Sequence, residues 1–494
     1  MTRQRIGVAL GLSLFVIILL LPGAAGLSPE GQRVAAVAVL MATWWISEAI
    51  PIPATALLPI VLFPALGIMK TSDVTASYGN HLIFLFMGGF LIAVTMEKWN
   101  LHKRIALHTI RIIGTGPNRI VLGFMLATGF LSMWISNTAT AMMMVPIALA
   151  VIYQAAASLE KTPGNTVDTR PGHFNFGMAL MLGVGYSASI GGVATLIGTP
   201  PNAILAGVIE RTYGVTISFA AWLTFALPLS ITLLLITWVY LTRIGFRSEI
   251  TELPGGRRLI DNQLAALGPM SREERWVLIV FTSVACAWIG RSLIDLPLLK
   301  TVQDSSIAIA GALILFLIPT NLKRREFLLD WPTAVKIPWD IILLFGGGFA
   351  LAHGFQQSGL SQWLAGQLTF LEGASPLVII FAVALLVIFL TEVTSNTATA
   401  TVLLPVMAAF AEAMQMHPYG LMITTALAAS FAFMLPVATP PNAIVFGTRY
   451  ITIPQMAKAG IWLNLLGCVL ITLFVTHALP AWWGIDLSPT TLGS

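Results

Sequence analysis

Charged side chains are scarce in this chain of 494 residues. Its 26 Lys and Arg and 21 Asp and Glu amount to 10%, whereas a soluble protein carries roughly 25%. Apolar residues make up 57%, and five uncharged stretches exceed the roughly 20 residues that span a bilayer: 120–159, 174–209, 213–242, 341–371 and 413–448. These features exclude a soluble enzyme and a disordered chain. We expect an all-α polytopic membrane protein with the lipid bilayer as its surroundings.

Cysteine is almost absent, and the histidines are dispersed. Cys286 and Cys468 both lie in apolar runs without the spacing of a disulfide framework or metal site, and none of the seven His pairs into a metal-binding pattern. The net charge of +5 would suggest nucleic acid in a soluble protein. Here the basic residues gather in loops, as expected on the cytoplasmic side of a membrane, so no nucleic-acid partner is predicted.

Placing the basic loops on the cytoplasmic side gives one consistent membrane topology. Basic clusters occur at 3–5, 98–119, 243–275 and 323–325, whereas 354–375 and the tail after Trp482 lack Lys and Arg. This predicts a plasma (inner) membrane protein of about eleven spans, with a cytoplasmic N-terminus and an external C-terminus. Residues 1–28 resemble a signal peptide, but we expect an uncleaved first helix because many spans follow. Residues 101–113 alternate basic and apolar faces, which is typical of a helix in the membrane interface.

Three motifs occur twice in the same order, which indicates an internal duplication. LFMGGF at 85–90 returns as LFGGGF at 344–349, and SNTAT at 136–140 returns at 395–399, both at an offset of 259. TPPNA at 199–203 returns at 439–443, at an offset of 240. In this topology, equivalent helices run in opposite directions. The halves therefore form an inverted repeat, an architecture in which transporters bind substrate near the membrane midplane.

Each Ser-Asn-Thr motif lies near the centre of a long apolar stretch that begins and ends on one side of the membrane. Such a stretch is either a re-entrant hairpin with its tip inside the membrane or two full spans joined by a surface turn. Residue counting alone leaves both possibilities open.

The Thr-Pro-Pro-Asn motifs predict broken helices. Thr199 and Thr439 lie about 15 Å from the ends of their stretches, at 1.5 Å per residue, and two successive prolines must interrupt the helix there. Broken backbone at that depth is tolerated beside a cavity or ligand. Free carbonyls and hydroxyls suit Na⁺, and helix N-termini suit a carboxylate. Because no Lys or Arg lies near the four motifs, bound cations would be needed to neutralise an anion.

These motifs, together with WWISEAIPIPAT at 44–55, resemble the divalent anion:sodium symporter family in its bacterial INDY-type dicarboxylate branch. The resemblance covers nearly the whole chain. It implies a homodimer whose protomers each have a scaffold domain and a transport domain that moves like an elevator. It also implies a small dicarboxylate at the two tips and one Na⁺ beside each tip.

The resemblance also assigns residues and domains. Substrate would contact the two tips and the two breaks, at Ser136, Asn137, Thr138, Ser395, Asn396, Thr397, Thr199, Pro200, Thr439 and Pro440. The first Na⁺ site would use Ser132, Ser136, Asn137 and the backbone at Gly198, and the second would use Thr391, Thr394 (backbone), Asn396 and the backbone at Ala438. The scaffold would comprise 1–118 and 273–372, the transport domain 119–245 and 373–484, with a cytoplasmic loop at 246–272 and an external tail at 485–494.

The predicted function is Na⁺-coupled uptake of C4-type dicarboxylates such as succinate, malate and fumarate. A Na⁺-independent dicarboxylate exchanger and a sulfate transporter are the alternatives within the family. An intramembrane enzyme is not expected, because Glu392 near Ser395 has no accompanying His. We interpret Glu392 as a carboxylate in a local polar contact, with a role in tuning the second Na⁺ site as the alternative. His81 and Asp340, at the 259 offset, are interpreted as interfacial and not functional.

Overall fold

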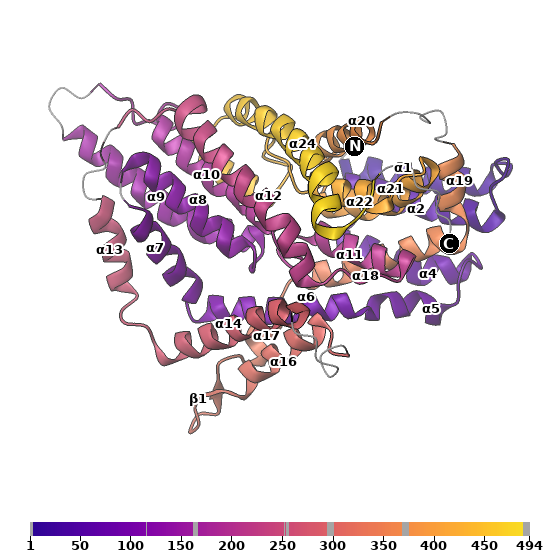
Figure 1. Cartoon of the computed structure of the whole chain (residues 1–494), viewed down its shortest axis with the longest axis horizontal. Coiled ribbons are helices and arrows are strands. Elements are labelled where there is room, and N and C mark those ends of the chain that lie inside the picture. The colour runs from indigo at the N-terminus through magenta and orange to yellow at the C-terminus, as the bar shows by residue number, and fades with distance from the viewer. Residues whose placement is uncertain are drawn as a thin grey trace.

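The computed structural model describes residues 3–114, 116–161, 166–250, 252, 256–293, 301–367 and 375–487, and these residues are almost entirely helical (Figure 1). The predicted end of the tail, 488–494, lies outside them. The elements of the first half are α1 (Arg3–Leu20), α2 (Pro29–Ser47), α3 (Ile52–Thr55), α4 (Leu58–Ala65), α5 (Thr71–Ala76), the 3₁₀ turn η1 (Ser77–Gly79), α6 (His81–Lys98), α7 (Leu101–Ile113), α8 (Pro117–Ser132), α9 (Asn137–Glu160), α10 (Asn175–Gly192), α11 (Pro200–Tyr213), α12 (Phe219–Val239) and the π-helical turn η2 (Tyr240–Gly245).

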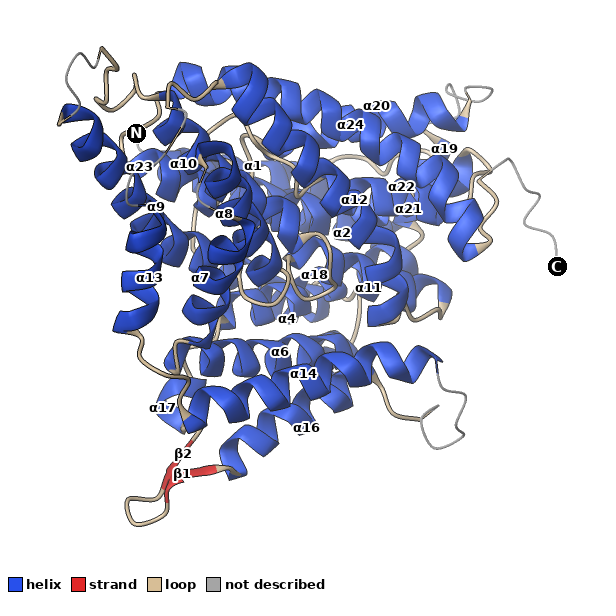
Figure 2. Ribbon diagram, turned by 60° about the vertical axis from the view of Figure 1, so that its left-hand side comes forward, coloured by secondary structure: helices blue, strands red, loops and turns tan. Residues whose placement is uncertain are grey.

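The second half continues from α13 to α24. Its elements are α13 (Gly256–Ala266), α14 (Arg272–Leu293), α16 (Asp304–Leu317), β1 (Pro319–Asn321), β2 (Glu326–Phe327), α17 (Trp331–Ala334), α18 (Trp339–Gln357), α19 (Leu360–Gly366), α20 (Pro376–Thr391), α21 (Asn396–Ala413), α22 (Pro418–Ala428), α23 (Pro440–Gly447) and α24 (Ile453–Trp483). The two short strands pair antiparallel, with Pro319 opposite Phe327 and Asn321 opposite Glu326, and this hairpin projects from the helices (Figure 2).

The duplication read from the sequence appears in the order of the elements. A long helix, a short helix, two hairpin arms, a helix broken in two and a second long helix follow one another as α6 to α12, and again as α18 to α24. Phe86 and Phe345, equivalent by the 259 offset, contact each other with ring centroids 4.8 Å apart. Equivalent residues meet only near the axis that relates two repeats, so this contact locates the axis between α6 and α18.

Glycines on the paired helices allow close approach of neighbouring backbones. A Cβ on Gly88 would lie 2.6 Å from Ala308 of α16, and a Cβ on Gly347 would fall inside contact distance of the Ala56 carbonyl. The two glycines are equivalent by the 259 offset. Small residues at such positions are a common basis of helix packing in membranes, where apolar burial gives little drive for association.

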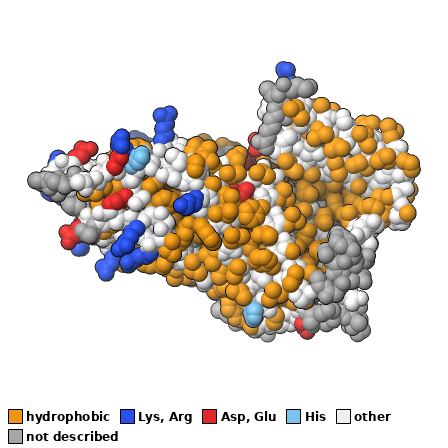
Figure 3. Space-filling model, turned by 90° about the horizontal axis from the view of Figure 1, so that it is seen from above, with side chains coloured by type: hydrophobic (Ala, Val, Ile, Leu, Met, Phe, Trp, Pro, Cys, Tyr) orange, Lys and Arg blue, Asp and Glu red, His pale blue; other side chains and the backbone are white. Residues whose placement is uncertain are grey.

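Four described segments are long and apolar enough to cross a bilayer alone: Thr71–Lys98, Asn137–Glu160, Phe219–Gly245 and Ile453–Trp483. Shorter apolar helices occupy Gln4–Leu20, Ile52–Ala65, Asp304–Leu317 and Pro376–Thr391. The other membrane crossings in the predicted topology would be built from helices that are broken or paired as hairpins, so helix length alone does not identify them. On the face in Figure 3, hydrophobic side chains cover most of the surface and charged side chains gather at one end of the long axis.

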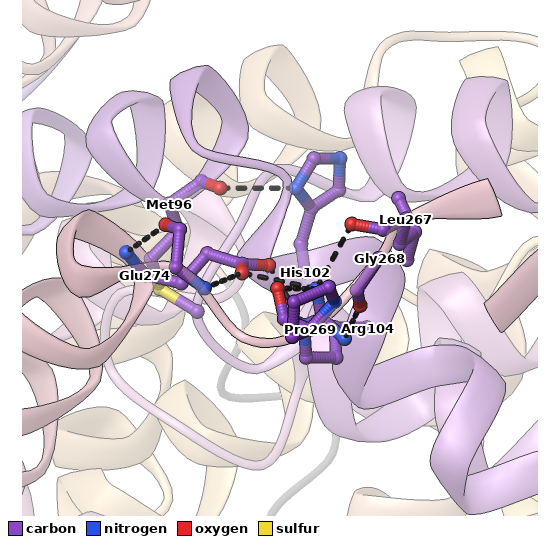
Figure 4. A network of polar contacts seen from close by, with 8 residues as sticks. Met96, His102, Arg104, Leu267, Gly268, Pro269 and Glu274 are labelled. Carbon is purple, nitrogen blue, oxygen red and sulfur yellow. Dashed lines mark hydrogen bonds and ion pairs between the residues drawn. The ribbon is translucent and has the colours of Figure 1, made fainter. Parts of the chain in front are cut away.

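Helix α7 has the bounds that the sequence predicts, but its basic residues are not all at the surface. Arg104 is only 8% exposed, and its Nε and Nη2 atoms donate to the two carboxylate oxygens of Glu274 on α14 at 2.8 and 3.0 Å (Figure 4). Nearby, burial lowers the pKa of His102 to about 4, and its Nδ1 lies 3.1 Å from the Met96 carbonyl. A buried carboxylate explains why an arginine leaves the water-facing side of the helix.

Candidate functional site

The two Ser-Asn-Thr motifs form tight turns between helices. Helix α8 ends at Ser132 and α9 begins at Asn137, while α20 ends at Thr391 and α21 begins at Asn396. Ser136 caps α9 by accepting a hydrogen bond from the Ala139 N–H at 3.2 Å. Serine is a preferred residue at this position because its hydroxyl satisfies an otherwise unpaired amide. Each motif therefore lies at the tip of a helical hairpin.

The two Thr-Pro-Pro motifs each follow a break in a helix, as the sequence predicts. Residues 193–199 separate α10 from α11, and residues 429–439 separate α22 from α23. Thr199 and Thr439 have nearly the same extended backbone, with φ of −144° and −142°, and each precedes a proline at the first helical position. Proline is favoured there because that N–H needs no helical partner.

Both tips and both breaks line one cavity of about 540 Å³. Every predicted substrate residue is among the lining residues: Ser136, Asn137, Thr138, Ser395, Asn396, Thr397, Thr199, Pro200, Thr439 and Pro440. Turns on opposite membrane surfaces could not meet in this way, so the geometry favours re-entrant hairpins over surface turns.

The cavity receives the N-terminal ends of four helices. The first residues of α9, α21, α11 and α23 all belong to its lining. A helix N-terminus presents free N–H groups and a partial positive charge, and both favour a bound anion. The arrangement therefore supplies positive potential from backbone alone.

Among the described residues, no Lys or Arg side chain lines this cavity. In the part of the chain that the structure describes, its charged lining residues are Glu48, after the end of α2, and Asp340, at the start of α18. Asp340 was predicted to be interfacial without a function, but it faces the cavity. An anion of two charges would thus need cations bound with it.

The first tip brings together the oxygens that a cation would use. Ser132 Oγ lies 2.5 Å from Asn137 Oδ1 and donates to the Ala188 carbonyl at 2.7 Å. The same amide position of Asn137 lies 3.1 Å from the Ala188 oxygen and 3.2 Å from the Gly198 oxygen, so an amide nitrogen there would donate to both. With the amide oxygen in that place, four oxygens face one another. Turned the other way, the Asn137 amide nitrogen donates to both carbonyls and to the Ser132 hydroxyl without any ion. The hydroxyl, amide and carbonyl oxygens gathered here are also the ligand types that a hard ion such as Na⁺ takes.

The second tip repeats the contacts of the hydroxyl. Thr391 Oγ1 donates to Asn396 Oδ1 at 2.7 Å and lies 3.1 Å from the Ala429 carbonyl. The Thr394 hydroxyl pairs with that of Thr399 at 2.6 Å, which leaves the Thr394 backbone as the predicted ligand. Ala438 lines the cavity, as Gly198 does in the first repeat.

Glu392 holds the backbone of the second break. It is 3% exposed, and it accepts hydrogen bonds from the N–H groups of Phe433, Met434 and Leu435 at 2.8, 2.8 and 3.0 Å. The Asn464 amide of α24 donates to it at 2.7 Å. The first repeat has Met133 in this place, where the Thr195 hydroxyl donates to the Met133 carbonyl at 2.5 Å and accepts from the Gly198 N–H. The interpretation of Glu392 as a local polar contact therefore holds, with the broken backbone as its partner.

Sequence reasoning missed the asparagines that end the Thr-Pro-Pro-Asn motifs. The Asn202 amide donates to the carbonyls of Val193 and Thr195 at 3.0 and 2.7 Å. Asn442 does the same to Ala432 and Leu435 at 3.0 and 3.1 Å. Both are fully buried, and each satisfies carbonyls that the break leaves without helical partners. Their presence in both motifs was the available signal.

Gly192 provides a test of the first cation pocket. A Cβ there would fall inside contact distance of Asn137 Oδ1 and 3.0 Å from the Gly198 oxygen. We expect Gly192→Ala to raise the Na⁺ concentration for half-maximal stabilisation by tenfold or more, because the methyl group occupies the space between ligands. Na⁺-dependent thermal unfolding measures this effect. Gly290→Ala is the control, since nothing lies within 4 Å of a Cβ at that position; equal Na⁺ dependence in the two variants would contradict this cation pocket.

Comparison with known proteins assigns the chain to a family. The family described as "Sodium:sulfate symporter transmembrane region" matches residues 3–487. The chain belongs to this family. The predicted resemblance to the divalent anion:sodium symporters is thus confirmed, and membership of a symporter family confirms a transporter in place of an enzyme.

Curated relatives in this symporter family are similar over nearly their whole length. The chain is 48% identical over 489 residues to "Sodium-dependent dicarboxylate transporter SdcS" of Staphylococcus saprophyticus, covering 98% of this chain and 93% of that protein. It is 46% identical over 488 residues to the protein of the same name in Staphylococcus aureus strain bovine RF122, with the same coverage.

Solved structures of other transporters share the fold. The Alcanivorax borkumensis YdaH transporter aligns with a TM-score of 0.53 at 12% identity, covering 83% of this chain and 87% of its own. Neisseria gonorrhoeae MtrF aligns with a TM-score of 0.54 at 11% identity, covering 94% of each chain. At these identities the likeness is one of fold alone, and it agrees with an all-α membrane transporter.

Proposed function

We propose that this protein couples inward movement of Na⁺ to uptake of small C4-type dicarboxylates such as succinate, malate and fumarate. One observation carries the proposal: two oxygen-lined pockets, at Asn137 and Asn396, border one cavity that has four helix N-termini and, among its described lining residues, no Lys or Arg. A dianion in that cavity is neutralised by the cations beside it, so substrate and Na⁺ bind together. The names of the two Staphylococcus relatives support the same substrate class and ion.

In this mechanism each tip holds one carboxylate of the substrate. The hydroxyls of Thr138 and Thr397 and the N–H groups that begin α9 and α21 donate to the two carboxylates. The side-chain oxygens of Asn137 and Asn396 face the ions. Two Na⁺ neutralise a dianion, and a third makes each cycle carry net positive charge inward.

The movement is an elevator. Residues 119–245 and 373–484 form the transport domain, which slides along a scaffold of 1–118 and 273–372. The protein works as a homodimer in the plasma membrane, with a cytoplasmic N-terminus and an external C-terminus. In this orientation Glu48 and Asp340 lie toward the cytoplasm, so the cavity described above faces inward.

Purified protein in liposomes tests the proposal. Labelled succinate uptake under an inward Na⁺ gradient is expected to exceed uptake in choline at least tenfold and to increase when the interior is made negative. Internal succinate should not be required. Uptake that is equal in choline and needs internal succinate would identify an exchanger, and competition by sulfate but not by succinate would identify a sulfate transporter; either result would contradict the proposal.

A further inference from the structure

Consecutive residues at the end of α11 bind elements of the proposed scaffold. Glu210 Oε1 lies 2.6 Å from His81 Nε2 at the start of α6. Arg211 donates through Nη1 to the Ser77 hydroxyl of η1 at 3.0 Å, and its Nη2 is paired with His353 Nδ1 of α18. These contacts join the transport domain to the scaffold, so the elevator movement must break them.

The same face of α11 packs tightly on α18. A Cβ on Gly207 would overlap the ring of Phe349, and the Thr212 carbonyl accepts a hydrogen bond from Gln356 Nε2 at 3.4 Å. None of these residues belongs to the cavity lining. In the proposed orientation this contact closes the external end while the cavity faces the cytoplasm.

The internal repeat supplies a counterpart at the other end. His81 is equivalent to Asp340 at the 259 offset, and α11 is equivalent to α23 at the 240 offset. The 240 offset takes Glu210 to Tyr450, which is buried; the charged residue at this place is its neighbour Arg449. The types of group are exchanged. The scaffold has an imidazole at the start of α6 and a carboxylate at the start of α18, whereas the transport domain has a carboxylate near the end of α11 and a guanidinium two residues after the end of α23.

The counterpart residues are separate in this structure. Asp340 and Arg449 are both exposed, and among the described residues no ion pair joins either of them to a partner. Asp340 instead faces the open cavity. This is the arrangement expected of a contact that forms in the opposite state.

We propose that Glu210–His81 and Asp340–Arg449 are the two halves of an alternating latch. In a carrier made of inverted repeats, the outward-facing state follows when the two repeats exchange conformations, so a contact made by one repeat passes to its equivalent in the other. The first pair then holds the inward-facing state, and the second pair closes the cytoplasmic end in the outward-facing state. The inference rests on the elevator movement proposed above.

Cross-linking in a background of Cys286→Ala and Cys468→Ala tests the latch. His81→Cys with Glu210→Cys, and Asp340→Cys with Arg449→Cys, are treated with a short bis-methanethiosulfonate reagent. We expect each pair to cross-link in a preparation in which the protein samples both states. When Asp340→Cys is linked to Arg449→Cys, an additional Thr138→Cys should react with external reagent only. A first pair that reacts while the second never does during transport would overturn the proposal.

Charge exchange gives an independent readout. Asp340→Arg is expected to lower the uptake rate about three- to tenfold, as loss of a modest ion pair shifts the conformational equilibrium. Adding Arg449→Asp should restore most of the uptake rate. If the two residues act independently, the losses of rate multiply in the double variant, and that result would contradict pairing. Asp330→Asn is the control, because its ion pair with Lys98 at 2.8 Å lies within the scaffold. Cross-linking does not depend on the substrate. If both cross-links form but the protein shows no Na⁺-driven succinate uptake, the proposed function is rejected and the latch is retained.

Discussion

Replacing Glu392 with leucine should raise the Na⁺ concentration needed for stabilisation and transport at least a hundredfold. The carboxylate accepts three backbone N–H groups of the second break and the Asn464 amide. The Phe433 N–H keeps a hydrogen bond to Asn464 Oδ1 at 3.2 Å, but the N–H groups of Met434 and Leu435 and the Asn464 amide lose their partner. Each buried donor left so costs about 1–3 kcal/mol, and three of them exceed the roughly 2.8 kcal/mol that corresponds to a hundredfold loss of affinity. We therefore expect the Na⁺ requirement to rise at least a hundredfold, measured by thermal unfolding over a Na⁺ titration.

A graded series separates this effect from simple misfolding. Asn464→Leu removes one donor and keeps the carboxylate bound to the backbone, so a smaller rise of about tenfold is expected. Glu412→Gln is the control at the far end of α21, where the carboxylate accepts from the Tyr213 hydroxyl at 2.9 Å. If Glu392→Leu folds as a monodisperse protein with normal Na⁺ dependence, the carboxylate does not organise the second cation pocket.

Asn137→Asp and Asn396→Asp should keep cation binding and lose substrate. Each change keeps an oxygen, adds a negative charge and removes the amide donor. At an effective dielectric of about 20, a carboxylate roughly 5 Å away costs on the order of 3 kcal/mol, so apparent succinate affinity should fall about a hundredfold. Succinate uptake kinetics and Na⁺-dependent thermal stabilisation, measured on the same preparations, separate the two effects.

Thr138→Val and Thr397→Val remove only a hydroxyl at each tip. Loss of a hydrogen bond to a charged group costs about 1.5–3 kcal/mol, which predicts a fall of roughly 10- to 150-fold in apparent succinate affinity. Na⁺ binding without substrate should barely change. Thr476→Val is the control on α24, where the hydroxyl bonds to the Thr472 carbonyl and lies outside the cavity lining. Normal succinate kinetics in well-folded Thr138→Val and Thr397→Val would show that the tips do not hold the substrate.

The sequence predicted the parts of this site that depend on local rules. Two successive prolines interrupt a helix, so the helix starts at Pro200 and Pro440 could be predicted; the ends of the preceding helices, at Gly192 and Ala428, could not. The bounds of 101–113 followed from its amphipathic period. Repetition then showed that both halves contribute equally, which is why every predicted substrate residue lines the same cavity.

Contacts between distant segments could not be read in this way. The partners of Glu392 lie 41 to 72 residues along the chain, and Glu274 lies 170 residues from Arg104. No local pattern marks such pairs, because their proximity depends on how helices pack. The same limit applies to the prediction for Asp340. Its position at a helix end was predicted correctly, but its exposure to the cavity depends on how α23 and both tips pack around it.

Labelling of cysteines at the two tips tests most directly whether the inverted repeats form one site that is exposed to each side in turn. Thr138→Cys and Thr397→Cys, each in the background without native cysteines, are treated with a membrane-impermeant reagent from the external or the cytoplasmic side. We predict that each cysteine reacts from both sides during transport, and that succinate protects it only when Na⁺ is present. Reaction of Thr138→Cys only from the cytoplasm and of Thr397→Cys only from outside, in every condition, would contradict the account.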